Sequence, residues 1–174
     1  MGKLYQNVGQ HLSGNFPGEI IVEIGSDRYE GSSSYFANLA NTHGMKFISV
    51  DFDEAARNRL NRTIPVEYSH LVEFVQSEGV SWTKLYQGSK IRVLYLDNFD
   101  WNWRTDLNET MILEQIKWYQ SRGIIMNNIN SQTTHITQMV NLLPHMSQKC
   151  VICVDDTYEY NGVFIGKGLS LIHI

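Results

Sequence analysis

The chain has 174 residues, of which 43% are hydrophobic and 18% are charged, and its formal net charge is −4. These values are typical of one globular domain with a sizeable core. No cluster of Lys and Arg exceeds two neighbours, which argues against a nucleic-acid partner. No apolar run approaches the roughly 20 residues of a membrane helix, and a signal-peptide h-region is missing, so we expect a cytoplasmic protein with no membrane partner.

Residues 1–18 precede the first predicted strand. Leu4, Val8 and Leu12 recur at helical spacing and Gly14 follows them, which predicts a short leading helix. We assign 1–174 to a single domain, in which this leading helix is followed by a core over residues 19–168 and a tail over residues 169–174.

The residues from 20 to 51 predict one βαβ unit. An apolar run ends in Gly25, a polar loop leads to Gly31, and apolar residues at helical spacing then predict a helix. Ser32 or Ser33 is expected to cap this helix, which ends near residue 44. A second apolar run then forms the second strand, which ends at residue 51.

The first turn of such a unit is where a ligand binds. Gly25 and Gly31 allow a ligand to approach the backbone, and the helix offers unpaired N–H groups. Asp51, at the end of the second strand, is placed to accept hydrogen bonds from a ribose diol. A nucleoside-containing cofactor is therefore the first hypothesis.

The turn is poorly suited to a pyrophosphate. Ser26 follows Gly25, and the second glycine of G-x-G-x-x-G is missing. Glu23 adds a carboxylate that would repel a pyrophosphate and favour a ligand with an amine or a positive charge. S-adenosylmethionine has an ammonium, a sulfonium and a ribose, and no phosphate, so it is the expected cofactor.

Helices and strands alternate along the rest of the chain. We expect helices at 54–60, 80–86, 110–122 and from 131 onward, and strands at 72–76, 91–96 and 150–154. This alternation predicts an α/β fold, a Rossmann-like three-layer sandwich with a mostly parallel sheet. Cys150 and Cys153 form a C-x-x-C inside the last strand, where they point to opposite faces, so we interpret them as buried reduced thiols.

Carboxylates follow the fourth and fifth strands. Asp97 and Asp100 come after the strand at 91–96, and Asp155 and Asp156 follow the strand at 150–154. Because the ends of parallel strands meet at one edge, Asp97, Asp155 and Asp156 would supply three hard oxygen ligands for Mg²⁺. Such an ion would hold the vicinal hydroxyls of an acceptor and lower the pKa of one of them.

Two further features lie near this edge. The aromatic residues from 99 to 103 favour an acceptor pocket, because the strand has already left the interior. His135 is expected in the first turn of a helix capped by Ser131, where the dipole disfavours its charged form and suits a neutral base. A surface position is the commoner interpretation of His135.

The sequence resembles a known family at these motifs. E-I-G, with an acidic residue ending the second strand, resembles the class I S-adenosylmethionine-dependent methyltransferases. E-G-S-S-S-Y-F-A resembles more narrowly the branch of macrocin-type sugar O-methyltransferases and so-called cephalosporin hydroxylases. The resemblance implies O-methylation of a small-molecule or sugar hydroxyl, with metal ligands at Asp97, Asp155 and Asp156. The candidate catalytic residues are Asp97 and Asp156, with His135 as the competing base. The implied cofactor-binding residues are Glu23, Gly25, Ser26, Gly31, Ser32, Asp51, Phe52, Ser77, Glu78 and Asp97.

A complete sheet of this class has seven strands, the last two forming an antiparallel hairpin. Residues 161–168 are turn-rich, so we expect these last two strands to be missing. The residues from 170 to 174, SLIHI, look like a translated sequencing-adapter remnant, which predicts a truncated reading frame.

Two other classes of function stay open. An NAD-dependent oxidoreductase or epimerase would share the βαβ unit and Asp51, but this chain lacks the phosphate glycines and a Tyr-x-x-x-Lys pair. A non-catalytic nucleoside-binding module would share the fold and could lose the carboxylates. Assembly of identical subunits is also left open.

Overall fold

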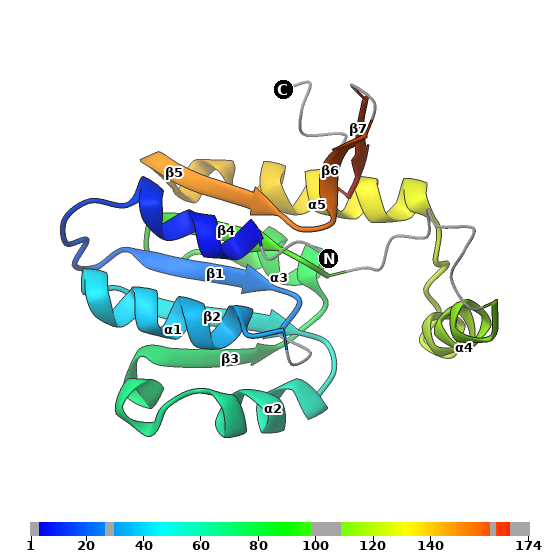
Figure 1. The fold of residues 1–174 in the computed structure, drawn as a ribbon, viewed down its shortest axis with the longest axis horizontal. Coiled ribbons are helices and arrows are strands. Elements are labelled where there is room, and N and C mark those ends of the chain that lie inside the picture. The colour runs from blue at the N-terminus through cyan, green and yellow to red at the C-terminus, as the bar shows by residue number, and fades with distance from the viewer. Residues whose placement is uncertain (1–3, 27–29, 99–108, 161–162, 168–174) are drawn as a thin grey trace.

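In the computed structural model, five strands form one sheet with helices on both of its faces (Figure 1). The structure describes residues 4–26, 30–98, 109–160 and 163–167. The strands are β1 (Ile20–Ile24), β2 (Lys46–Asp51), β3 (Val72–Gln76), β4 (Ile91–Leu96) and β5 (Met146–Val154). Their order is β3-β2-β1-β4-β5 and every pair is parallel, which confirms the predicted α/β, Rossmann-like fold.

The α-helices are α1 (Ser32–His43), α2 (Ala55–Thr63), α3 (Gly79–Leu85), α4 (Glu109–Gln120) and α5 (Asn128–Leu142). Three short 3-10 helices complete the set: η1 (Leu4–His11), η2 (Val66–Leu71) and η3 (Leu143–His145). Among these described helices, none has both the length and the apolar character needed to cross a membrane.

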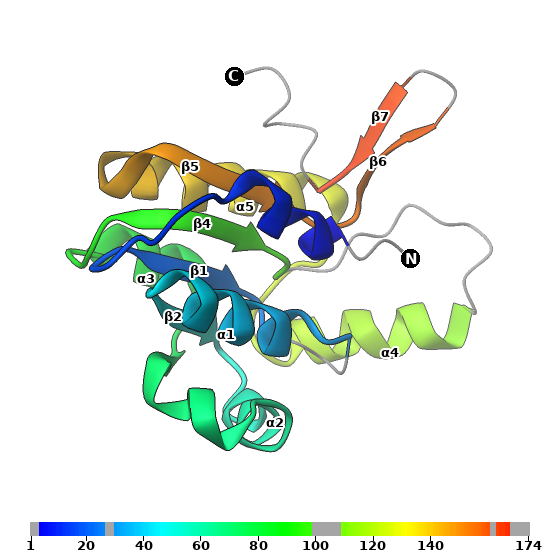
Figure 2. The same cartoon turned by 60° about the vertical axis from the view of Figure 1, so that its left-hand side comes forward.

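The helices form two layers, one on each face of the sheet (Figure 2). η1, α1 and α2 pack on one face, where Phe36 and Phe47 belong to a buried cluster that also includes Tyr95. α5 covers the opposite face, where Met139 and Leu142 pack in a second buried cluster. β1 lies between these layers, so all of its residues are buried and its sequence is apolar except for one glutamate.

Several element boundaries differ from the sequence-based expectation. The leading helix is a 3-10 helix, η1, and ends at His11. Gly31 occupies the N-cap position of α1 with no side-chain cap, so neither of the next two serines caps this helix. α5 begins at Asn128 and is capped by Asn127, whose side chain accepts from the Asn130 N–H, so Ser131 lies inside the helix.

A hairpin follows the fifth strand. β6 (Thr157–Tyr160) and β7 (Val163–Gly166) pair antiparallel in a sheet of their own. The stretch that we described as turn-rich therefore contains a β-strand, but neither strand of the hairpin joins the parallel sheet. In the described part of the chain, the parallel sheet ends at β5, and the hairpin projects from its edge (Figure 1).

The two cysteines point to opposite faces of β5, as predicted. Cys153 packs against the cluster under α1, and Cys150 packs against the cluster under α5. Both thiols are free and half-buried. Burial raises the pKa of each to about 12, so neither carries the thiolate that redox chemistry or zinc binding needs.

Candidate functional site

Glu23 lies in the middle of a buried hydrogen-bond cluster. Its carboxylate accepts from Ser32 Oγ at 2.7 Å, from Ser33 Oγ at 2.6 Å and from Ser49 Oγ at 2.8 Å. Hydrogen bonds to a carboxylate compensate its removal from water. The two serines that were expected to cap α1 thus tie this helix to the end of β1.

Asp51 holds the backbone of two loops. Its Oδ2 accepts from the Ser26 N–H at 2.9 Å, and its Oδ1 accepts from the Asp53 N–H at 2.8 Å. Ser26 Oγ also contacts Ser49 Oγ at 2.7 Å, within the same cluster as Glu23. Each carboxylate oxygen can accept a further hydrogen bond, so these contacts still allow a ribose contact at Asp51.

Gly25 is required by the protein's own backbone. Its φ is +93°, and a Cβ at this position would lie 2.4 Å from the Asn98 N atom. The space beside Gly25, where we expected a ligand to approach the backbone, is therefore occupied by the backbone of Asp97 and Asn98. Gly31 also has a left-handed φ, and the neighbouring Glu30 carbonyl accepts from the Tyr5 hydroxyl, so η1 contacts the chain directly before α1.

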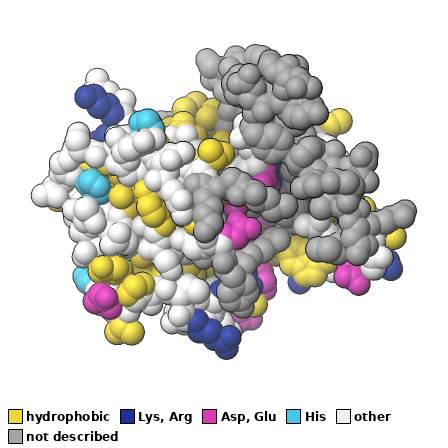
Figure 3. Space-filling view, viewed as in Figure 1, with side chains coloured by type: hydrophobic (Ala, Val, Ile, Leu, Met, Phe, Trp, Pro, Cys, Tyr) yellow, Lys and Arg dark blue, Asp and Glu magenta, His cyan; other side chains and the backbone are white. Residues whose placement is uncertain are grey.

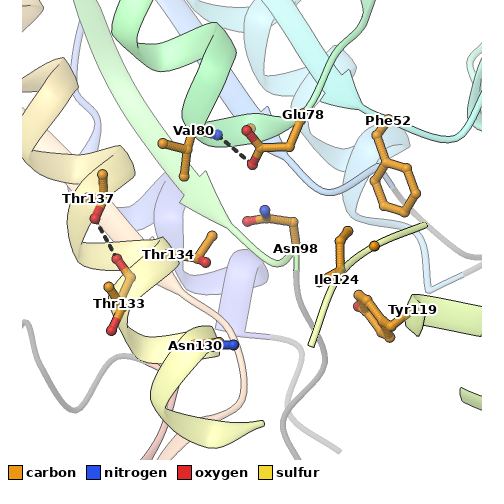
Figure 4. Close-up of a pocket in the computed structure, with 12 residues that line it drawn as sticks. Phe52, Glu78, Val80, Asn98, Tyr119, Ile124, Asn130, Thr133, Thr134 and Thr137 are labelled. Atoms are coloured by element: carbon orange, nitrogen blue, oxygen red, sulfur yellow. Dashed lines mark hydrogen bonds between the residues drawn. The ribbon is translucent and has the colours of Figure 1, made fainter. Parts of the chain in front are cut away.

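A pocket of about 370 Å³ opens at the ends of β2, β3 and β4 (Figure 4). It is lined by Phe52, Glu78, Gly79, Val80, Asn98, Tyr119, Gly123, Ile124, Asn130, Thr133, Thr134 and Thr137. One wall is apolar and aromatic, and the opposite wall carries the hydroxyl and amide groups of α5. A planar, partly polar ligand suits this combination.

Two of the predicted cofactor-binding residues, Phe52 and Glu78, line this pocket. Glu78 is also the N-cap of α3, where its side chain accepts from the Val80 and Ser81 N–H groups. Ser77 does not line the pocket. The threonines of α5 were not predicted as site residues, although T-T-x-x-T places polar side chains on one side of a helix that is otherwise partly apolar.

An aromatic contact brings α4 to the pocket. The Phe52 ring lies 5.2 Å from the Trp118 ring, and the Arg122 guanidinium lies 3.9 Å from the centre of the Trp118 ring. Tyr119, the next residue of α4, is buried and lines the pocket. Cation–π and aromatic contacts of this kind stabilise a helix that makes few other contacts with the sheet.

The predicted carboxylates do gather at the ends of β4 and β5. One carboxylate oxygen from each of Glu30, Asp97 and Asp155 lies within 4.8 Å of the other two, and Glu30 was not predicted as a member. Figure 3 shows acidic side chains near the middle of the face that is turned to the viewer. The Tyr95 hydroxyl donates to Asp155 Oδ2 at 2.8 Å.

Lys167 brings a positive charge into this cluster. Its Nζ lies 2.8 Å from Asp97 Oδ1 and 3.0 Å from Asp156 Oδ2. Burial raises the pKa of Asp97 to about 7, and Lys167 opposes that rise. An ammonium therefore contacts two of the three carboxylates expected to hold Mg²⁺, so the arrangement does not fit a divalent ion between Asp97 and Asp156.

His135 is fully buried in α5, so the expectation of a surface position is wrong. It lies in the interior of the helix rather than in its first turn, and its Nδ1 is 2.6 Å from the Ser131 carbonyl oxygen. Burial, with a smaller contribution from Lys167, lowers its pKa to about 4. The ring does not line the pocket, and its role as a base stays a prediction.

Two predicted features cannot be placed. Asp100 and the aromatic residues 99–103 lie outside the described residues. Asn98, directly before these residues, lines the pocket.

Comparison with known proteins shows the fold that this chain shares with others. No family model and no curated protein sequence matches the chain. It is similar to a SAM-dependent methyltransferase from Thiobacillus denitrificans, solved in complex with S-adenosyl-L-homocysteine, with 11% identity over 91% of this chain and 49% of that chain and a TM-score of 0.51. A protein from Corynebacterium glutamicum gives 7% identity, 88% and 56% coverage, and a TM-score of 0.53.

A short-chain dehydrogenase/reductase, glucose/ribitol dehydrogenase, from Brucella melitensis is similar to the same degree. Its identity is 10%, the coverage is 92% of this chain and 66% of that chain, and the TM-score is 0.51. The chain thus spans about half the length of the first two proteins. Because the fold is shared by both kinds of enzyme, the residues of the site have to discriminate between them.

Proposed function

We propose that this protein binds S-adenosylmethionine and transfers its methyl group to a hydroxyl of a small molecule or sugar. One observation carries the proposal: Phe52, Glu78 and Asn98 line one pocket at the ends of β2, β3 and β4, and Asp51 lies directly before Phe52. An aromatic ring beside a ribose-binding carboxylate suits an adenosine.

The order of the strands supports one direction for the bound cofactor. With the adenine in the pocket and the ribose at Asp51, the sulfonium would extend across the end of β1 toward β4. Asp97 ends β4, and Asp155 and Asp156 end β5, so an acceptor at these residues would lie on the far side of the methyl group. This arrangement supports transfer at the edge formed by β4 and β5.

The transfer is a displacement at the methyl carbon. An oxygen of the acceptor forms a bond to this carbon while the carbon–sulfur bond breaks, which leaves a neutral thioether. The hydroxyl proton has to leave, because a neutral alcohol is a poor nucleophile. Asp97 is the candidate base that accepts this proton, because it directly follows β4 and 21% of its side chain is exposed.

Two features favour S-adenosylmethionine over NAD. The turn after β1 lacks the glycines that cradle a pyrophosphate, and Gly25 is packed against the chain at Asn98. Glu23 places a carboxylate behind the same turn, where a pyrophosphate would gain no compensating charge. The dehydrogenase relative of similar TM-score makes NAD the alternative that has to be tested directly.

Calorimetry with S-adenosylmethionine, S-adenosylhomocysteine and NAD in parallel tests the proposal. We expect both sulfur compounds to bind and NAD to bind much more weakly. Binding of NAD alone would support an oxidoreductase. If adenosine were to bind as well as S-adenosylmethionine and no methyl transfer were found with any hydroxyl acceptor, a non-catalytic nucleoside-binding module would be favoured.

A further inference from the structure

Gln138 is a buried amide with no hydrogen-bond partner among the described residues. Its side chain is 0% exposed, and neither its Nε2 nor its Oε1 is paired. Asn98 Oδ1 is likewise buried without a partner in the described part of the chain. Burial removes such groups from water without replacing the lost hydrogen bonds, which destabilises the fold. Unpaired buried amides of this kind therefore call for a functional explanation.

Gly79 brings this amide next to the pocket. Gly79 and Asn98 both line the pocket, and the Asn98 side chain lies between Val80 of α3 and Thr134 of α5 (Figure 4). A Cβ on Gly79 would lie 2.3 Å from Gln138 Nε2 and 3.1 Å from Asn98 Nδ2, so both amides approach the same point beside Gly79. Gln138 does not itself line the pocket. It can therefore act on a ligand through Asn98.

The same two helices pair their polar groups one turn further along. Asn141 of α5 donates from Nδ2 to Thr83 Oγ1 at 3.1 Å, and the Thr83 hydroxyl donates to the Val80 carbonyl at 2.9 Å. The contact between α3 and α5 thus satisfies an amide where it lies away from the pocket. The unpaired amide of Gln138 is therefore a property of its position beside Gly79, rather than of the helix contact in general.

Glu78, one of the implied cofactor-binding residues, is already engaged in the fold. Its Oε1 accepts from the Val80 N–H and its Oε2 accepts from the Ser81 N–H, each at 2.8 Å. These two bonds hold the carboxylate at the start of α3. The neighbouring carboxamide of Asn98 is thus the better candidate to bind the edge of a base in this pocket.

We propose that Asn98 binds the edge of the nucleobase that carries N1, and that Gln138 holds the Asn98 amide in the orientation that selects adenine over hypoxanthine. The inference rests on the proposed binding of S-adenosylmethionine and names the residues that recognise its base. With the ribose at Asp51 and the ring beside Phe52, the edge of the base farthest from the ribose would face Asn98 and α5.

The selectivity follows from the two ends of a carboxamide. They have nearly the same shape, but the oxygen accepts hydrogen bonds and the nitrogen donates them. If Gln138 Nε2 donates to Asn98 Oδ1, Asn98 Nδ2 is left to donate to N1 of adenine, which is an acceptor. N1 of hypoxanthine carries a hydrogen, so two donors would meet and this base would be disfavoured. Gln138 is thus a positioning residue that acts through Asn98.

Calorimetry with adenosine and inosine, whose bases differ only at C6 and N1, tests the proposal. We expect the wild type to bind adenosine about tenfold more tightly than inosine, or better, because the wrong base leaves one donor unpaired. Gln138→Met keeps the size of the side chain and removes both amide atoms, so Asn98 can turn and the preference should fall to about twofold or less. Asn98→Asp offers acceptors alone, so this variant should prefer inosine.

Asn141→Leu is the matched control in the same helix contact. It removes the bond to Thr83 and should lower the melting temperature, but it should leave the preference for adenosine unchanged. The ratio of the two affinities therefore separates the positioning of Asn98 from a general loss of stability. Circular dichroism checks that each variant is folded.

Equal binding of the two nucleosides by the wild type would overturn the proposal, as would an unchanged preference in Gln138→Met. If Gln138→Met does not fold, Asn98→Asp decides, and a retained preference for adenosine in that variant overturns the proposal. If S-adenosylhomocysteine binds and the preference does not depend on Gln138, this inference alone fails. If the preference depends on Gln138 and S-adenosylmethionine does not bind, the proposed function alone fails.

Discussion

The Ser26 N–H donates to Asp51 Oδ2 over 2.9 Å, and this bond joins the turn after β1 to the end of β2. Ser26 Oγ also contacts Ser49 Oγ, and Ser49 Oγ donates to the Glu23 carboxylate. Ser26 and Asp51 are therefore connected to the hydrogen-bond cluster around Glu23. Buried hydrogen bonds thus fix the position of the turn after β1 and of the end of β2. The residues that would contact a ligand lie at the ends of the strands.

Asp51→Asn should weaken S-adenosylmethionine binding about ten- to a hundredfold, because a charge-assisted ribose contact contributes roughly 1.5–3 kcal/mol. The amide preserves the shape and can still accept from one of the two backbone N–H groups. Calorimetry measures the change, and the melting temperature separates it from a loss of fold. Glu54→Gln, an exposed change beside the N-terminus of α2, is the control. An unchanged dissociation constant would remove Asp51 from the binding site.

Phe52→Ala should lower the affinity for S-adenosylhomocysteine by about tenfold or more, because stacking of a base on an aromatic ring contributes roughly 1–3 kcal/mol. The same change removes the contact of Phe52 with Trp118, so we also expect a change in tryptophan fluorescence as α4 loses its anchor. Phe74→Ala is the control, since Phe74 contacts Arg57 away from this pocket. Equal affinities of the two variants would place the adenine elsewhere.

Ser33→Ala should destabilise the protein by roughly 1–3 kcal/mol, because it removes one buried hydrogen bond to the Glu23 carboxylate. The melting temperature in thermal denaturation measures this loss. Ser81→Ala in α3 is the matched control, because Ser81 is exposed and should tolerate alanine. If both variants melt at the same temperature, the buried serine cluster does not contribute to stability.

His135→Asn should change the pH dependence of stability. The pKa of His135 falls from 6.5 to about 4 on folding, so below pH 6.5 the unfolded chain takes up a proton that the folded chain does not. The wild type should therefore lose stability relative to His135→Asn as the pH falls from 6.5 to 4, by at most roughly 3 kcal/mol. The charges of Lys167 and Asp156, which also act on the pKa of His135, are unchanged in the comparison.

Melting temperatures of the two proteins between pH 4 and pH 8 provide the measurement. A constant difference across this range would mean that His135 titrates alike in both states. Methyl-transfer activity at saturating acceptor tests the predicted role of His135 as a base. If the His135→Asn variant is active, His135 is not the base and contributes only to the structure.

The sequence by itself determined the sheet. The apolar run Ile91–Leu96 has the same bounds in the structure, because a strand buried on both faces is apolar along most of its length. The bounds of the half-exposed edge strand Val72–Gln76 were also predicted correctly. It also determined that Asp51, Asp97 and Asp155 end their strands at one edge, since parallel strands bring their carboxyl ends together.

Only the tertiary structure decided what each of these side chains contacts. The spacing of Ser32 and Ser33 is compatible with a helix cap, and the approach of β1 directs them to Glu23 instead. Lys167 lies 70 positions from Asp97 along the chain, so no local pattern could pair them. Side-chain partners depend on contacts between distant segments, and these are fixed by packing rather than by local spacing.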